Sequence, residues 1–241
     1  MEVKLLRVTE EGLALVADAA RVSGFPSMQG MEAMVKLITD NDYSSVLEHI
    51  CFTFDIEGIS VALSRELLEH RIASHTARST RYNGEEEFEY YVPGRLSSNE
   101  EAMRIYREAM KSANEAYVRL RGLGIGKEEA RYVLPMALHT HYIVTMNVRS
   151  LINFFMLRLC VRASPEMREL AMRMYKICVR EYPVIFSSIW CRGFTSGVCP
   201  ENKARPAECP FRGIISNKQV VKREFETEAR RIIEKELAKS A

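Results

Sequence analysis

The first third of the chain contains two kinds of hydrophobic pattern. Residues 2–8 and 50–59 are predicted strands, the second because it alternates and is rich in β-branched and aromatic side chains. Residues 10–22, 31–40 and 60–71 are predicted helices. Thr9 is the expected N-cap of the helix at 10–22. In the helix predicted at 60–71, Val61, Leu68 and Ile72 fall close to one face.

The middle of the chain combines a further strand with a long helix. After the turn signal Asn83-Gly84, residues 85–93 predict a strand whose acidic triplet forms a solvated edge. Residues 98–122 predict the longest helix, and its apolar stripe favours core packing, with a face between subunits as the alternative. Residues 122–127 fit a helix end and a turn, and residues 127–134 fit a short helix.

The last part of the chain is mainly helical. A strand is predicted at 137–147, and residues 149–163 are apolar on almost every side, which indicates a buried helix. A second helix begins at Ser164-Pro165-Glu166, and residues 216–241 predict a charged amphipathic helix. Because helices alternate with a few strands without regular βαβ units, we expect an α+β fold. It would be a single domain over residues 1–241, with a mixed or antiparallel sheet flanked by long helices.

Composition limits the classes of function. The chain has 241 residues, 47% of them hydrophobic, so a sizeable core can form. A formal net charge of +2 is too balanced for a general nucleic-acid-binding protein, so any anion site has to be local. No apolar run approaches a membrane span, and the N-terminal residues lack a signal-peptide core. We therefore expect a soluble cytoplasmic protein that binds neither nucleic acid nor membrane.

The six cysteines fall into two groups. Three lie in apolar segments, which predicts buried small side chains: Cys51, Cys160 and Cys178. Three lie in the Pro- and Gly-rich residues 191–210, namely Cys191, Cys199 and Cys209. A metal knuckle, a disulfide and reduced thiols are all open for the second group. Because no C-x-x-C pair is present, no metal site is assigned.

The residues best suited to bind a ligand lie in the segment 66–82, ELLEHRIASHTARSTRY. It combines histidines and arginines with small hydroxyl side chains: His70, Arg71, Ser74, His75, Thr76, Arg78, Ser79, Thr80 and Arg81. Arginine can bind a phosphate through two parallel hydrogen bonds. A helix end with satisfied histidines and surface arginines is the structural alternative. The concentration of these residue types favours a phosphate or nucleotide site.

The predicted buried helix at 149–163 also carries polar groups. Arg149 and Asn153 share one face, while Arg158 lies about half a turn away from Arg149 and Arg162 shares the side of Arg158. An unpaired buried charge costs several kcal/mol or more, so these cations need partners. Two arrangements would supply such partners. The cations could form salt bridges with buried carboxylates, or they could line two anion pockets, one on each side of the helix.

Four ordered segments resemble the flavin-dependent thymidylate synthases. His70-Arg71, seven residues, Ser79 and then Arg81-Tyr82 resemble the family signature of an arginine-histidine-arginine triplet, seven residues and a serine. Residues 44–58, 130–135 and 145–159 resemble other blocks of the family in the same order. Together the matches cover roughly residues 40–185.

The resemblance implies a fold like that of the thymidylate synthase complementing proteins. It also implies a homotetramer with FAD at the subunit interfaces. The implied activity is that of a methyltransferase in dTMP biosynthesis, which converts dUMP to dTMP with 5,10-methylenetetrahydrofolate as carbon donor. Reduced FAD, regenerated by NADPH, would be the hydride source. Residues 191–215 and 216–241 would then be an extension atypical of the family.

Carried over by position, the resemblance implies two sets of site residues. The FAD contacts would be Ser45, His70, Arg71, Asn147, Arg149 and Asn153. The dUMP contacts would be Glu66, Ser79, Arg81, Arg131 and Arg158. Arg158 and Ser79 are the catalytic candidates. Arg158 would sit at the pyrimidine edge and favour ionisation of N3, while Arg81 and Arg131 suit the anionic end of the nucleotide.

The chain departs from the family pattern at several positions. Glu69 stands where the signature has its first arginine, and our hypothesis is that Arg78 compensates for this reversed charge. Arg162, Ser164 and Pro165 replace a run that closes over the flavin in the family. Two alternative functions follow. One is a divergent enzyme that modifies another pyrimidine nucleotide, and the other is a homologue that binds flavin or nucleotide without catalysis.

Overall fold

The computed structural model describes residues 1–25, 30–201 and 205–239. At its centre is a four-stranded antiparallel sheet with the strand order β1-β2-β4-β3. The strands are β1 (Glu2–Val8), β2 (Cys51–Ser60), β3 (Ser74–Ala77) and β4 (His139–Asn147). The predicted α+β class and antiparallel sheet are therefore confirmed.

The two central strands have one apolar and one polar face. Phe52, Phe54 and Ile56 of β2 are fully buried, as is Val144 of β4, which lies opposite Phe54. Side chains alternate along a strand, so a slip of one residue would turn this whole apolar set towards solvent. The burial of one face therefore fixes the register of β2 against β4.

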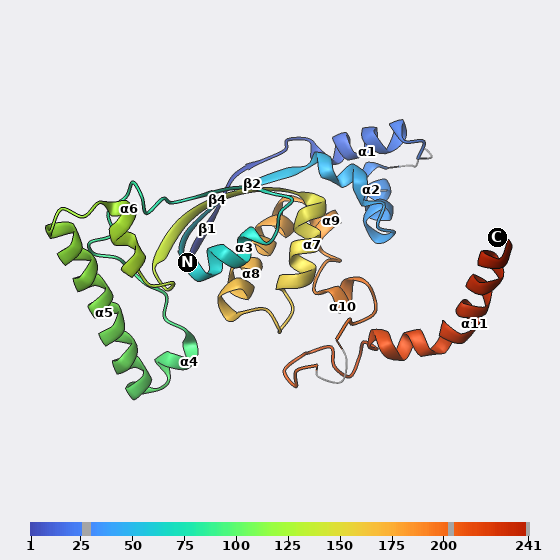
Figure 1. Ribbon diagram of the computed structural model, residues 1–241. Helices are drawn as coiled ribbons and strands as arrows, with labels where there is room; N and C mark the ends of the chain where they lie inside the picture. The colour runs from blue at the N-terminus through green and yellow to red at the C-terminus, as the bar shows by residue number, and fades with distance from the viewer. Residues whose placement is uncertain (26–29, 202–204, 240–241) are drawn as a thin grey trace.

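Helices cover the apolar face of the sheet (Figure 1). Beneath it lie α3 (Val61–Leu68), α7 (Val148–Arg158), α8 (Pro165–Glu181) and α9 (Pro183–Phe186). At one end are α1 (Gly12–Val22), α2 (Met31–Asp40) and the 3-10 helix η1 (Ser44–His49). Leu151, Phe154 and Phe155 of α7 are fully buried in the resulting core.

A second group of helices stands beside the sheet (Figure 1). It comprises α4 (Gly94–Ser97), α5 (Glu100–Gly122), α6 (Lys127–Ala130) and the 3-10 helix η2 (Arg131–Val133). Met110 and Tyr117 of the α5 stripe are buried, and the Tyr106 hydroxyl donates to the Tyr91 carbonyl at 2.6 Å. The predicted core packing of α5 is thus confirmed for part of its apolar stripe. These buried residues of α5 are not part of the main hydrophobic core under the sheet.

The chain ends in α10 (Arg192–Thr195) and α11 (Lys218–Lys239), and α11 extends away from the body of the molecule (Figure 1). Within the described residues, no helix combines the length and the apolar character needed to span a membrane.

Three local predictions were wrong. Thr9 does not cap α1, since Glu11 is the N-cap residue and the Thr9 hydroxyl accepts a hydrogen bond from Cys51 N at 2.9 Å. Residues 85–93 do not form a strand, although Tyr90 makes an isolated bridge with Leu138. Glu85 is not solvated but buried, since the Arg78 Nε lies 2.9 Å from its carboxylate.

The exposed and buried sides of two helices also differ from expectation. α3 buries Leu63 and Leu67, while Leu68 is 45% and Ile72 76% exposed. α7 is not covered on every side, because Asn153 and Leu157 are exposed. Cys51, which was expected to be buried, is exposed, whereas Cys178 is buried as predicted.

A pair of buried side chains joins α3 to α8. Ser60 is the N-cap of α3, and its hydroxyl accepts from Leu63 N at 2.9 Å. The carboxylate of Glu166 accepts from the Ser60 backbone N–H at 2.7 Å and from its hydroxyl at 2.6 Å. Both side chains are buried, so each hydrogen bond replaces water that cannot reach them.

We expect Glu166→Ala to lower the free energy of unfolding by about 1–3 kcal/mol, because the buried Ser60 N–H loses its acceptor. Chemical denaturation followed by circular dichroism measures this change. Glu169→Ala is the matched control, since Glu169 pairs with Arg173 at the surface. An equal effect of the two substitutions would contradict the role assigned to Glu166.

Candidate active site

Three of the predicted site residues meet where α3 and α7 end. Arg158 Nε donates to His70 Nε2 at 2.9 Å, and Arg158 Nη1 lies 3.7 Å from the Glu66 carboxylate. Ser164, which precedes α8, donates to the two Glu66 oxygens at 3.0 and 3.1 Å. The Arg158 side chain is 23% exposed, so this cation is held in a partly buried ion pair.

His70 is neutral in this arrangement. Arginine nitrogens only donate, so His70 Nε2 has to be the acceptor and the ring proton lies on Nδ1. Burial, the guanidinium of Arg158 and the nearby His75 lower the pKa of His70 to about 4. The ring also packs edge-on against Phe154, with centroids 4.8 Å apart. His70 therefore orients Arg158 without adding a second positive charge.

A second cluster lies at the turn after β3. Ser79 is half-buried, and its backbone carbonyl accepts from the Asn83 side chain at 2.9 Å. Arg81 pairs with Glu128 of α6 at 2.9 Å, and both side chains are largely exposed. Lys127 Nζ donates to the Tyr82 carbonyl at 2.9 Å, which joins this turn to α6. Ser79 and Arg81 thus belong to this second cluster, and Arg131 begins η2 directly after α6.

A third group lies at the start of α7, on the flavin side predicted from sequence. Ser45 and Arg149 line one cavity of about 730 Å³, together with Phe25, Leu37 and Tyr43. The Arg149 Nη1 lies 2.6 Å from the Glu48 carboxylate, and both side chains are exposed. This cavity combines a cation and a serine hydroxyl with apolar walls. That composition suits a ligand with an anionic part and an aromatic part.

The other predicted flavin contacts are spread over the chain. Asn147 is the N-cap of α7, where its side chain accepts from Ser150 N at 2.8 Å. Asn153 is exposed on α7, and Arg71 is exposed in the segment after α3. These residues do not join the cavity beside Ser45 within one chain.

Arg78 has a different partner from the one we hypothesised. Its Nε lies 2.9 Å from the Glu85 carboxylate, and its Nη2 donates to the Gly84 carbonyl at 3.3 Å. Glu69 is exposed at the C-cap of α3. The structure therefore gives Arg78 partners in the turn after β3, and its compensation for Glu69 stays a hypothesis.

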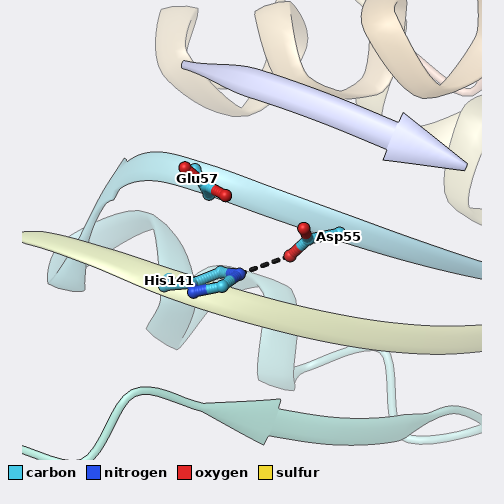
Figure 2. A group of neighbouring side chains, drawn as sticks. All are labelled: Asp55, Glu57 and His141. Atoms are coloured by element: carbon cyan, nitrogen blue, oxygen red, sulfur yellow. Dashed lines mark hydrogen bonds and ion pairs between the residues drawn. The ribbon is translucent and has the colours of Figure 1, made fainter. Parts of the chain in front are cut away.

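A group of metal-ligating side chain types lies on the open face of the sheet. Figure 2 shows Asp55 and Glu57 on β2 beside His141 on β4, with an ion pair between Asp55 and His141. One ligand atom from each residue lies within 4.8 Å of the others. Lys4 lies 3.9 Å from Glu57, so cations of the chain itself already compensate the carboxylates. We assign this group to cross-strand pairing.

Comparison with known proteins identifies the family. The family described as thymidylate synthase complementing protein matches residues 4–184. The chain belongs to this family. It is also 40% identical over 214 residues to a flavin-dependent thymidylate synthase from Geobacter sulfurreducens, covering 83% of this chain and 91% of that protein.

Archaeal relatives have the same name. A flavin-dependent thymidylate synthase from Sulfurisphaera tokodaii is 40% identical over 199 residues, which cover 77% of this chain and 76% of the relative. One from Pyrococcus furiosus is 34% identical over 233 residues, covering 87% and 93%. The resemblance drawn from the sequence is thus confirmed for this member of the thymidylate synthase complementing protein family.

Sequence reasoning missed two residues that position the site in this family member. Ser164 was treated only as a departure from the family pattern, yet it binds Glu66. Glu166 was seen as part of a helix start, yet it binds Ser60. A glutamate in the first turn of a helix is a common signal for capping, so its sequence position gave no indication of a long-range partner.

We expect His70 to remain neutral at pH values where an ordinary histidine is protonated, and to titrate near pH 4. Because its pKa is lowered by folding, the contribution of His70 to stability is present above pH 6.5 and is lost as the pH falls towards 4. Histidine NMR titration, assigned with the His70→Asn variant, measures this pKa.

Arg158→Ala should raise the pKa of His70, because it removes a neighbouring cation that disfavours protonation. Arg173→Ala, which removes an exposed arginine of α8, is the control. A His70 signal that titrates near 6.5 in the unaltered protein would overturn the neutral assignment.

Proposed function

We propose that the chain is a flavin-dependent thymidylate synthase that converts dUMP to dTMP. Its carbon donor would be 5,10-methylenetetrahydrofolate, and FAD reduced by NADPH would be the hydride source. The observation that supports this most strongly is the meeting of Arg158, His70 and Glu66 in a chain of this family.

Arg158 is suited to stabilise negative charge on a pyrimidine. Its Nε is occupied by His70, so the guanidinium is held in one orientation while N–H groups on its terminal nitrogens remain for a ligand. A cation at the pyrimidine edge lowers the cost of ionising N3 and of placing electron density on the ring. Because His70 and Glu66 already fix its position, Arg158 needs little reorganisation during the reaction.

Arg81 and Arg131 are suited to the phosphate of the nucleotide. Arg81 is bound to Glu128 in a pair that is exposed on both sides. Exposed ion pairs contribute about 0–1 kcal/mol, so a phosphate can replace the carboxylate at little cost. Ser79 lies in the turn before Arg81 and would add a hydroxyl donor beside the nucleotide, which is its proposed catalytic role.

The residues at the start of α7 fit FAD. The cavity beside Ser45 has the size of a cofactor site, with apolar walls next to the Arg149 guanidinium. Arg149 and Ser45 would hold the diphosphate, and Asn153 would extend the same face of α7. His70, Arg71 and Asn147 complete the proposed set. When bound, reduced flavin supplies the hydride that completes the methyl group.

The proposed sites require more than one copy of the chain. The substrate residues at α6 and at the end of α7 belong to separate clusters, and α7 leaves Asn153 and Leu157 exposed. We therefore propose the homotetramer, with FAD at the subunit interfaces. We also propose a cytoplasmic location, and we regard residues 191–215 and 216–241 as an addition to one family domain.

We expect the purified protein to be yellow and to release tritium from 5-tritiated dUMP when supplied with FAD, NADPH and methylenetetrahydrofolate. Arg158→Ala should lower the rate of release by about 100-fold or more, the usual loss when a preorganised charge donor is removed. Scintillation counting of released water measures the rate. Arg173→Ala, on the surface of α8, is the control.

A flavin-loaded protein that releases no tritium from dUMP would contradict the proposed substrate. It would favour a divergent enzyme that acts on another pyrimidine nucleotide. The observation behind this second candidate is the exposed Glu69 directly before His70, where the family signature has an arginine. The same assay with other 5-tritiated pyrimidine nucleotides tests it. A colourless protein that FAD does not reconstitute would overturn both.

A further inference from the structure

Four cysteines line one cavity of about 290 Å³ between the end of α7 and the loop at 191–215. They are Cys160, Cys191, Cys199 and Cys209, and we call this space the four-cysteine cavity. All four carry free thiols. Cys160 follows α7, inside the family match, whereas the loop lies beyond its end at residue 184. The fold thus adds a fourth thiol to the three that are close in sequence.

The described parts of the loop, residues 191–201 and 205–215, are held around this cavity by close contacts and hydrogen bonds. A Cβ on Gly193 would lie 3.2 Å from Cys199 Cβ and 3.3 Å from its Cα, which is tighter than most Cβ contacts, so glycine allows this close approach without a shift of Cys199. Cys199 N donates to the Ser216 carbonyl at 2.9 Å, and Lys218 N donates to the Cys199 carbonyl at 2.7 Å. These contacts close the loop and fix Cys199 beside the segment that carries Cys191.

Cys191 is a partly buried free thiol on the wall of this cavity. The backbone N–H groups of Phe194 and Gly193 donate to its sulfur. Such N–H donors tune the sulfur ligands of iron–sulfur centres. Burial raises the pKa of the Cys191 thiol, and the adjacent thiols of Cys160 and Cys209 raise it further.

The cationic side chains around the cavity favour an anionic ligand. Four arginines line the cavity together with one carboxylate, namely Arg158, Arg162, Arg192, Arg205 and Glu201. Glu201 pairs with Arg162, and Arg158 pairs with Glu66, so the arginines still outnumber the carboxylates around the cavity. Arg205 is only 8% exposed, and its Nη1 donates to the carbonyls of Phe211 and Ile215 at 3.1 and 2.8 Å. Among the described residues, its hydrogen-bond partners are neutral carbonyls. A buried cation of this kind is stabilised by a neighbouring negative charge.

We propose that the four-cysteine cavity binds an iron–sulfur cluster of the 4Fe–4S type. Four thiolates are the ligands of such clusters, and the bound complex is anionic. In a tetrahedral zinc site the sulfurs lie about 3.8 Å apart, given a zinc–sulfur distance of about 2.3 Å. Across the described residues, no three of these thiols come within 4.8 Å of one another. A cubane separates its cysteine sulfurs further, and the cavity offers that space.

This site was not predicted from the sequence. The sequence left a metal knuckle of the three loop cysteines open without assigning it, because they lack a C-x-x-C pair. It did not indicate Cys160, which is 31 residues before Cys191. The proposal does not depend on the proposed function, because no residue of the flavin cavity takes part. Arg158 alone lines the four-cysteine cavity and also belongs to the candidate active site.

The full chain should be purified without oxygen and, in parallel, reconstituted with ferrous iron and sulfide. We expect about four irons and four acid-labile sulfides per chain, with a Mössbauer spectrum of a 4Fe–4S cluster. Flavin absorbs in the same visible region, so the iron and sulfide contents decide the result. Tightly bound zinc without labile sulfide would overturn the proposal, and so would a chain that takes up no iron after reconstitution.

Substitution of single ligands tests the assignment of the thiols. Cys160→Ala and Cys191→Ala should each lose most of the iron and sulfide. Cys51→Ala is the matched control, since Cys51 is exposed on β2 and lies outside the cavity. Circular dichroism separates loss of the cluster from loss of the fold. A folded Cys160→Ala variant with unchanged iron and sulfide would overturn the four-cysteine assignment.

Discussion

The position of the candidate active site depends on two hydrogen-bonded contacts between α3 and the start of α8. Glu166 binds Ser60 at the beginning of α3, and Ser164 binds Glu66 near its end. α3 has eight residues, which is too short to be stable on its own. These two contacts hold both ends of α3 against the start of α8. Because His70 follows α3 directly, they also decide where the acceptor of Arg158 lies.

Elements with a clear local period could be predicted from the sequence. β2, β4, α5 and the start of α8 were predicted close to their observed bounds, because the burial of one face gives each element a regular hydrophobic period. β3 was taken for a cationic loop. It has four residues and pairs only with β4 at the sheet edge, so its extended form depends on a partner 65 or more residues away. Glu85 was misjudged for a similar reason, since Arg78 buries it.

Side-chain spacing left two alternatives for the cations of α7, buried carboxylates or two anion pockets, and the structure gives each cation a carboxylate partner that is partly exposed. Arg149 and Arg158 each have a carboxylate partner, Glu48 and Glu66. Each also lines a cavity. The pairs differ in burial, because Arg149 is exposed while Arg158 is mostly covered. The period of a helix tells which residues share a face, but how far neighbouring elements cover each face depends on the whole fold.

The loop at 191–215 changes the surroundings of the active site at the end of α7. Cys160 lies two residues after Arg158, so any ligand that ties Cys160 to the loop restricts the same turn of chain that carries the guanidinium. Arg162 of this turn also pairs with Glu201 of the loop at 3.4 Å. The end of α7 is therefore fixed from two sides, by His70 and Glu66 on one and by the loop on the other. A charge placed in the four-cysteine cavity acts on Arg158 through space in a partly buried setting, where screening by solvent is weak.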